Sequence, residues 1–248
     1  DMKRIDVVGF GPGDDRHMTY QAREAIEKAD VIIGYTTYIR MLERYFPTAS
    51  FMDTPMTKEI ERCRMAVPLA EEGKRVALVS SGDAGVYGMA GILLQILEKE
   101  GKDIPVEVIP GVTAANAGAA MLGAPLMHDY AVISLSDRMT PLEDIMRRVE
   151  YAAMGDFVLA LYNPKSRKRT EYLGMAAERI GKYRSGRTPV GIVRHAGRPE
   201  AQMCLTTLEK LGDAFVDMFS IVIIGNSRTY VKNGRMITPR GYESKEAF

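Results

Sequence analysis

A glycine-rich stretch at residues 81–88 lies between two apolar segments of different periodicity. The segment before it, residues 75–80, is an apolar run of strand length, and residues 89–98 repeat apolar side chains at helical spacing. A strand that ends in a small-residue turn and opens a helix is where an α/β sheet binds ligands. Glycines let a ligand approach the backbone, and the helix start offers free N–H groups. The alternative is a tight turn in which Asp83 caps the following helix.

The first half of the chain alternates strand-like and helical segments. Strands are predicted at residues 4–10, 31–34, 75–80 and 106–109, and helices at 19–29, 35–46, 60–72, 89–98 and 110–122. Pro68 is expected to bend the third helix. The alanine and glycine face of the last helix implies very close packing on a neighbour. Strands that alternate with helices imply a largely parallel sheet.

A break at residues 123–125 precedes a second set of elements. Strands are predicted at residues 131–136, 157–162, 189–193, 202–207 and 220–225, with helices from Pro141 and from about Lys168. The last three strands have fewer helices between them, which favours antiparallel pairing. We therefore predict a two-lobed α/β fold, with a mostly parallel sheet in residues 1–124, a mixed sheet in residues 125–242 and a loose tail at 243–248.

The charge and cysteine content exclude several classes of protein. The formal net charge of +1 argues against nucleic-acid and anionic-membrane partners. No apolar run reaches the roughly 18 residues of a membrane span, and no secretory signal precedes the first strand. Two cysteines, Cys63 and Cys204, are too few for a disulfide framework or an iron–sulfur site. A cytoplasmic protein is the expectation.

A second glycine-rich segment, residues 9–13, follows the first predicted strand with the sequence Gly-Phe-Gly-Pro-Gly. It differs from the dinucleotide-binding fingerprint, because Asp14 occupies the third glycine position. The acid expected at the end of the second strand is also missing, since that strand ends at Gly34 and Tyr35. This argues against a Rossmann oxidoreductase and weakens the interpretation as a common Rossmann-type methyltransferase. The alternative is a rigid glycine–proline turn.

Five patterns occur in order along nearly the whole chain. They are Gly-Pro-Gly at 11–13, Gly-Asp-Ala-Gly-Val-Tyr-Gly at 82–88, Pro-Gly-Val-Thr-Ala-Ala at 110–115, Leu-Tyr-Asn at 161–163 and Val-Arg-His-Ala-Gly at 193–197. Together they resemble the tetrapyrrole methylase family, which methylates uroporphyrinogen-derived rings with S-adenosylmethionine. Residues 82–90, 114–125, 133–137, 161–167 and 225–242 resemble the members that methylate ring carbon C17, with ring contraction, in cobalamin biosynthesis. Those members differ from others that have Gly-Asp-Pro at positions 82–84.

The resemblance implies a two-lobed fold with the cofactor folded in a cleft between the lobes, commonly in a homodimer. S-adenosylhomocysteine would be the product, and no metal or iron–sulfur cluster of the protein's own is expected. Asn163 stands where several relatives have methionine, so its contact is expected from its backbone. The cofactor-binding residues that the resemblance implies are Pro12, Gly82, Asp83, Ala84, Val86, Thr113, Ala114, Tyr162, Asn163 and Ala196.

The chemistry of methyl transfer fits a site with few ionisable groups. The sulfonium methyl is already a strong electrophile, so transfer needs alignment and exclusion of water more than acid or base. Ring contraction would use a proton shuttle, for which Asp137 and His195 are candidates. The alternatives are a turn residue for Asp137 and a packed loop histidine for His195.

The substrate bears many carboxylates, which calls for cations around it. Arg138, Lys165 and Arg194 are the candidates, because they follow strand-like segments and arginine holds a carboxylate with two hydrogen bonds. Solvated basic residues are the alternative, above all at Lys168 and Arg169. The sequence leaves open whether the tetrapyrrole carries cobalt. It also leaves open methylation at another ring position, or a cofactor-binding module without catalysis.

Overall fold

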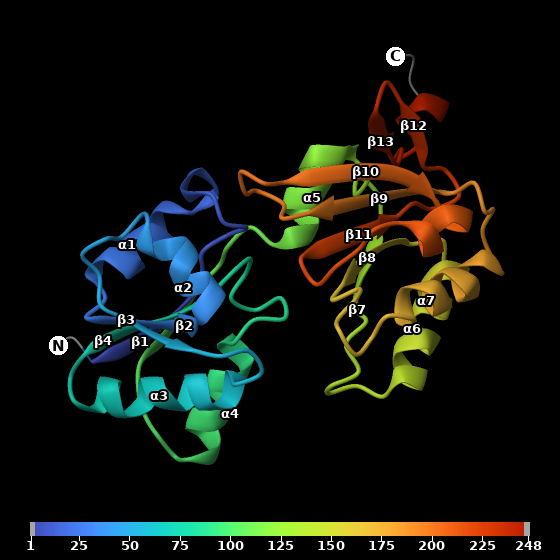
Figure 1. Ribbon diagram of the computed structural model, residues 1–248. Coiled ribbons are helices and arrows are strands. Elements are labelled where there is room, and N and C mark those ends of the chain that lie inside the picture. Colours follow the sequence, from blue (N-terminus) through green and yellow to red (C-terminus); the bar gives the residue numbers. More distant parts are fainter. Residues whose placement is uncertain (1–2, 246–248) are drawn as a thin grey trace. The chain divides into compact units, whose positions relative to one another are not determined.

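The computed structural model describes residues 3–245 of the 248-residue chain and divides into two compact units, Asp1–Ala114 and Ala115–Phe248 (Figure 1). The sequence predicts the boundary later, at residue 124. The difference lies in helix α5 (Ala114–Leu122), whose small residues pack on the sheet of the second unit. A Cβ atom on Gly118 would lie 2.7 Å from Cγ2 of Ile221, and one on Gly191 would lie 2.4 Å from Cδ1 of Leu122. The predicted close-packed face of this helix therefore belongs with the second unit.

The first unit contains a five-stranded sheet of order β3-β2-β4-β1-β5 in which every neighbouring pair is parallel. Its parallel pairing confirms the prediction. The strand at residues 51–54 was not predicted, because its sequence Phe-Met-Asp-Thr lacks the valine and isoleucine residues that mark β5, a strand of equal length at the other sheet edge. The strands are β1 (Arg4–Gly9), β2 (Val31–Tyr35), β3 (Phe51–Thr54), β4 (Arg75–Ser80) and β5 (Val106–Ile109).

Helices cover both faces of this sheet (Figure 1). Alternate side chains of the strands face opposite ways, so Val8 packs with α1 and α2, whereas Val7 packs with α3 and α4. Helix α3 continues through Pro68. The helices are α1 (Tyr20–Lys28), α2 (Thr36–Glu43), α3 (Glu59–Glu71) and α4 (Ala90–Lys99), with a 3-10 turn η1 at Asp15–His17.

The second unit contains a mixed sheet, as predicted, and its strand order is β10-β9-β11-β8-β7. Strands β7 and β8 are parallel, and the other neighbouring pairs are antiparallel. Helices α6 and α7 pack on one face with the 3-10 helix η2. The elements are β7 (Tyr130–Ser134), α6 (Leu142–Met154), β8 (Val158–Tyr162), α7 (Tyr172–Gly181), β9 (Pro189–Arg194), β10 (Gln202–Thr207), η2 (Leu208–Asp213) and β11 (Ser220–Ile224).

Three features of this unit differ from the sequence prediction. Helix α7 begins at Tyr172 rather than near Lys168, so the basic run lies in a loop. A small sheet of β12 (Tyr230–Lys232), β13 (Arg235–Ile237) and β6 (Gly123–Ala124) was not predicted. Residues 243 and 244 of the predicted loose tail belong to a 3-10 turn, η3 (Tyr242–Ser244), and residues 246–248 of the tail lie outside the described residues. Among residues 3–245, no helix combines the length and apolarity that crossing a membrane requires.

Candidate functional site

Three loops of the first unit meet at the carboxyl ends of β1, β4 and β5. These strands are parallel neighbours, so the loops that follow them lie at the same sheet edge. Two backbone hydrogen bonds join the first two loops: the Gly11 N–H donates to the Gly82 carbonyl at 3.0 Å, and the Gly82 N–H donates to the Gly11 carbonyl at 2.8 Å. The glycine-rich segments at residues 9–13 and 82–88 therefore form one structure.

Backbone packs directly against backbone in these loops. A Cβ atom on Gly111 would lie 2.1 Å from the Gly82 carbonyl oxygen and 2.5 Å from that of Gly9. One on Gly88 would lie 2.2 Å from the Ala84 carbonyl oxygen. Real Cβ contacts are never this short, so no other residue fits at either position without a shift of the backbone.

Asp83 joins the third loop to the second. Its Oδ2 accepts from the N–H groups of Gly85 and Val86 at 2.8 and 2.9 Å, and its Oδ1 accepts from the Gly111 N–H at 2.9 Å. Burial acts to raise the pKa of this carboxyl, but the backbone N–H donors outweigh it and hold the pKa below its ordinary value. Asp83 does not cap helix α4, which begins at Ala90.

The loop after β4 combines a buried anchor with an exposed tip. Ala84 is fully buried, backbone included, and its carbonyl accepts from the Ala90 N–H at 3.1 Å, whereas Val86 and Tyr87 are 40% and 54% exposed. Backbone polar groups beside exposed apolar side chains fit a ligand with polar and apolar parts, as S-adenosylmethionine has. The structure brings together the loops that carry seven predicted cofactor residues: Pro12, Gly82, Asp83, Ala84, Val86, Thr113 and Ala114.

The remaining predicted site residues follow β7, β8 and β9 of the second unit. Strand β9 is antiparallel to β11, which is antiparallel to β8, so the carboxyl ends of β7, β8 and β9 share one sheet edge. Tyr162 ends β8, and its hydroxyl oxygen accepts from the Ala115 N–H at 3.0 Å. The other predicted residues in the loops at this edge are Asp137, Arg138, Asn163, Lys165, Arg194, His195 and Ala196.

Arg169 links the loops after β7 and β8. The sequence did not predict this role. Its Nη1 donates to the carbonyls of Leu135 and Asn163 at 3.1 and 2.9 Å. Asn163 has a φ of 50° and donates through Nδ2 to Ser134 Oγ at 2.9 Å. A basic run gives no sign of which of its members turns inward. Arg169 therefore helps to fix the conformation of Asn163.

Asp137 is engaged by side chains of the same network. The Tyr172 hydroxyl donates to Asp137 Oδ2 at 2.6 Å, and this bond raises the pKa of the tyrosine. Arg169 Nε lies 4.0 Å from Asp137 Oδ1. These contacts favour the alternative that Asp137 holds a turn over the role of a proton shuttle.

Arg194 and His195, at the end of β9, also have close partners. Arg194 donates to Asp217 Oδ2 from Nε and Nη2, at 3.2 and 3.1 Å, and to Gln202 Oε1 at 2.9 Å. The His195 ring stacks on Phe219 with centroids 4.9 Å apart. Burial, followed by the charge of Arg198, lowers the pKa of His195 and favours neutral imidazole. Arg194 is thus committed to an ion pair, whereas Arg138 is exposed and Lys165 is half-buried.

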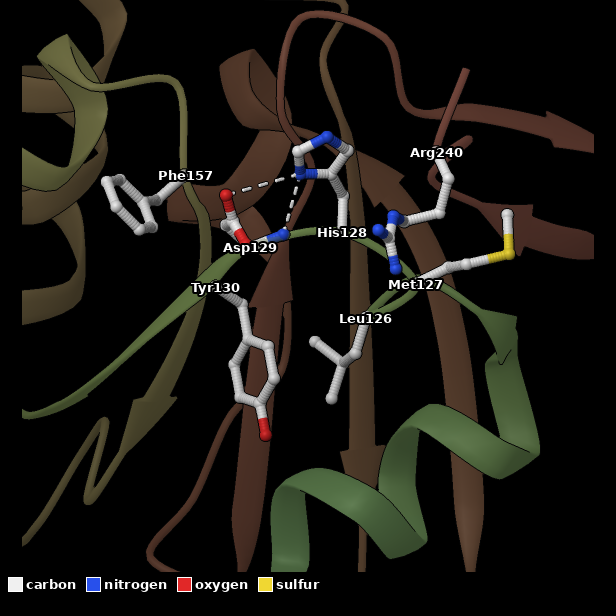
Figure 2. A pocket seen from close by; sticks show the side chains of 7 residues that line it. All are labelled: Leu126, Met127, His128, Asp129, Tyr130, Phe157 and Arg240. Carbon is white, nitrogen blue, oxygen red and sulfur yellow. Dashed lines mark hydrogen bonds and ion pairs between the residues drawn. The ribbon is translucent and has the colours of Figure 1, made fainter. Parts of the chain in front are cut away.

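An open pocket elsewhere in the second unit contains none of the predicted site residues. Figure 2 shows its lining side chains pointing in different directions, with dashed lines from His128 Nδ1 to the backbone nitrogen and to the carboxylate of Asp129. The Asp129 N–H donates to His128 Nδ1 at 2.7 Å. The pocket is lined by Leu126, Met127, His128, Asp129, Tyr130, Phe157 and Arg240.

Comparison with known proteins gives one family. Residues 4–212 match the family described as Tetrapyrrole (Corrin/Porphyrin) Methylases. A Salmonella typhimurium relative named "Probable cobalt-factor III C(17)-methyltransferase" is 47% identical, with 96% of this chain and 99% of the relative covered. "Cobalt-factor III methyltransferase" of Priestia megaterium is 47% identical over 98% of this chain, which spans 46% of that longer relative.

Solved structures agree with the fold. The crystal structure of the methyltransferase CobJ has a TM-score of 0.87 and 33% identity, with 95% of this chain and 99% of that chain covered. A uroporphyrin-III C-methyl transferase from Thermus thermophilus, complexed with S-adenyl homocysteine, has a TM-score of 0.69. That likeness covers 90% of this chain and 92% of the other at 24% identity, and it shows the fold alone.

Proposed function

Because this chain belongs to the tetrapyrrole methylase family, we propose that it transfers a methyl group from S-adenosylmethionine to C17 of cobalt-factor III, with ring contraction, in cobalamin biosynthesis. The observation that carries the proposal is 47% identity, over 96% of this chain, to the Salmonella relative of that name. Metal-free precorrin-3B is the alternative substrate that the sequence leaves open. A cytoplasmic homodimer is part of the proposal.

The cofactor would supply the electrophilic methyl group, and the protein would bind it, orient it and exclude water. In the first unit, the loops after β1, β4 and β5 offer backbone groups and small residues for this task. The apolar side chain of Val86 is exposed for contact with the adenosyl part. In the second unit, Tyr162, Asn163 and Ala196 are the proposed cofactor contacts.

Substrate binding is proposed for Arg138, Lys165 and Arg194. Arg138 and Lys165 lie in the loops after β7 and β8, where a carboxylate-bearing ligand would find them. Arg194 would have to share its guanidinium with Asp217, so replacing it also releases that carboxylate. His195 is the proposed proton shuttle; burial lowers its pKa, which keeps the imidazole neutral but also makes it a weaker base.

Mass spectrometry of the tetrapyrrole product tests this function. The protein is incubated anaerobically with S-adenosylmethionine and, in parallel, with cobalt-factor III or precorrin-3B. A gain of one methyl group on cobalt-factor III, matched by S-adenosylhomocysteine, is the expected result. A gain of a methyl group on precorrin-3B alone would show that the substrate is the metal-free ring and not cobalt-factor III. No gain on either ring, with cofactor bound, would contradict catalysis and favour a binding module.

A further inference from the structure

We propose that Asp83 is a positioning residue that acts on the cofactor through the backbone, rather than a group that touches it. Its carboxylate fixes the loop after β4 to the loop after β5. The inference rests on the proposed cofactor site in these loops. It assigns to Asp83 a different role from the direct contact that the family resemblance implies.

The hydrogen bonds of Asp83 occupy both carboxylate oxygens. Oδ2 receives two backbone N–H groups of its own loop, and Oδ1 receives the Gly111 N–H from a loop 28 residues further along the chain. An ionised carboxylate has about four acceptor sites, and three of them are therefore filled by the protein. All three donors are backbone groups, which favour the ionised form without a partner cation.

The Asp83–Gly111 bond completes a chain of contacts across the three loops. Gly82 joins the β4 loop to Gly11 of the β1 loop through backbone bonds, and the next residue, Asp83, joins it to the β5 loop. The Gly111 Cα hydrogens face the Gly82 and Gly9 carbonyls, with no room for a Cβ between them. Of these links, the Asp83 carboxylate is the one made by a side chain, so it can be removed without changing a glycine. Losing it would remove the acceptor of the Gly111 N–H, two residues before Thr113.

Two substitutions separate the local bonds from the link between loops. Asp83→Ser keeps a hydroxyl that can accept from N–H groups two or three residues later, but it is too short to reach Gly111 at the same time. Asp83→Asn keeps the size of the side chain, but its NH₂ group cannot accept hydrogen bonds, so the N–H donors at one end lose their acceptor. Asp14→Asn is the matched control, because Asp14 accepts a local bond from the Arg16 N–H at 2.9 Å in another loop of the same unit.

Hydrogen exchange without ligand reads the link directly. We expect the amide of Gly111 to exchange at least tenfold faster in Asp83→Ser than in the native chain, and to be unchanged in Asp14→Asn. Asp83→Ser also loses the stability that its carboxylate contributes, so the exchange of Gly111 is compared with that of core amides in strand β4, which should accelerate less. Native protection of Gly111 in Asp83→Ser would overturn the proposal.

Binding of cofactor analogues separates positioning from contact. We expect Asp83→Ser to weaken binding of S-adenosylhomocysteine about tenfold by calorimetry, with KM for S-adenosylmethionine raised more than kcat is lowered. If Asp83 only positions the loops, Asp83→Ser should weaken the binding of analogues without the ribose hydroxyls or the amino group by the same factor. No single ligand group would then contact the carboxylate. A factor that disappears with one analogue would overturn the proposal in favour of direct contact, and native affinity would overturn it as well. If the native chain binds no S-adenosylhomocysteine, the proposed function fails instead, whatever the exchange of Gly111 shows.

Discussion

The loops at the carboxyl ends of the strands are held differently in the two units. In the first unit, backbone meets backbone at Gly11, Gly82 and Gly111, and one carboxylate completes the set. In the second unit, long side chains reach between the loops: Arg169 donates to two carbonyls, and Tyr172 holds Asp137.

The difference teaches how much change each cluster can accept. Contacts between backbone atoms leave no space for a Cβ, so a methyl group added there displaces a loop. A side-chain anchor can be shortened while the backbone around it keeps its path, at the expense of unpaired carbonyl groups. We therefore expect single substitutions at Gly11, Gly82 or Gly111, the first cluster, to lower stability strongly. Substitutions at Arg169 or Tyr172, the second cluster, should lower it by smaller amounts.

The largest expected effect is that of Gly111→Ala. The new Cβ would lie 2.1 Å from the Gly82 carbonyl oxygen, and a backbone atom cannot turn away as a flexible side chain does. We expect a loss of about 3 kcal/mol or more in the free energy of unfolding, and loss of S-adenosylhomocysteine binding. Urea denaturation and calorimetry measure the two effects.

Gly91→Ala is the control for this substitution. Gly91 lies in helix α4 with nothing within 4 Å of a built Cβ. Alanine should stabilise that helix, by at most about 1 kcal/mol, because it is the better helix former. If Gly111→Ala and Gly91→Ala have the same stability, the backbone packing around Gly111 does not exclude a Cβ atom there.

A smaller effect is expected from Arg169→Ala in the second unit. The substitution leaves the carbonyls of Leu135 and Asn163 without this donor and should cost about 1–3 kcal/mol. Arg169→Lys should recover part of it, because an ammonium group cannot reproduce the planar guanidinium. Urea denaturation measures both, and Lys168→Ala, an exposed neighbour, should stay within about 0.5 kcal/mol of the native chain. Equal stability of Arg169→Ala and Lys168→Ala would remove Arg169 from the loop-holding role.

Runs of apolar and β-branched residues predicted the strands of the two five-stranded sheets other than β3, including β10, none of whose residues is buried. They did not predict β3, whose sequence Phe-Met-Asp-Thr has no such run, or the small sheet around β13, whose strands have at most three residues. Before the late start of α7, Arg169 bonds to one carbonyl of its own loop and to one of the loop after β7, and no local pattern encodes the second contact.

The glycine-rich turns of the first unit were predictable as loops after parallel strands, and the structure brings these loops together. The roles within it were not all predictable from sequence. Asp83 suggested a helix cap, but its partner Gly111 belongs to another loop, and only the fold brings the two together. In the second unit, Arg194 was predicted to be available to substrate, although Asp217, a distant residue, holds it in an ion pair.

The smallest expected effect is the pH dependence of the stability that Asp83 and Asp217 contribute, and it compares one carboxylate from each unit. In both groups burial acts to raise the pKa, hydrogen bonds outweigh it, and the pKa lies below the ordinary 3.8. A depressed folded pKa gives stability that is present above the unfolded value and is lost as the pH falls through the folded one. Asp83→Asn and Asp217→Asn should therefore each flatten the loss of stability below about pH 4.

Salt should separate the two carboxylates. Asp217 is paired with the charged Arg194, and both side chains are about a quarter exposed, at 27% and 25%, so added salt should shrink its contribution. Asp83 is held by uncharged N–H groups within a few ångströms, so its contribution should change little. Urea denaturation of the native chain and both variants, from pH 5 to pH 2 with and without about 0.5 M sodium chloride, measures this. Equal salt sensitivity would show that the two clusters are not held by different kinds of contact.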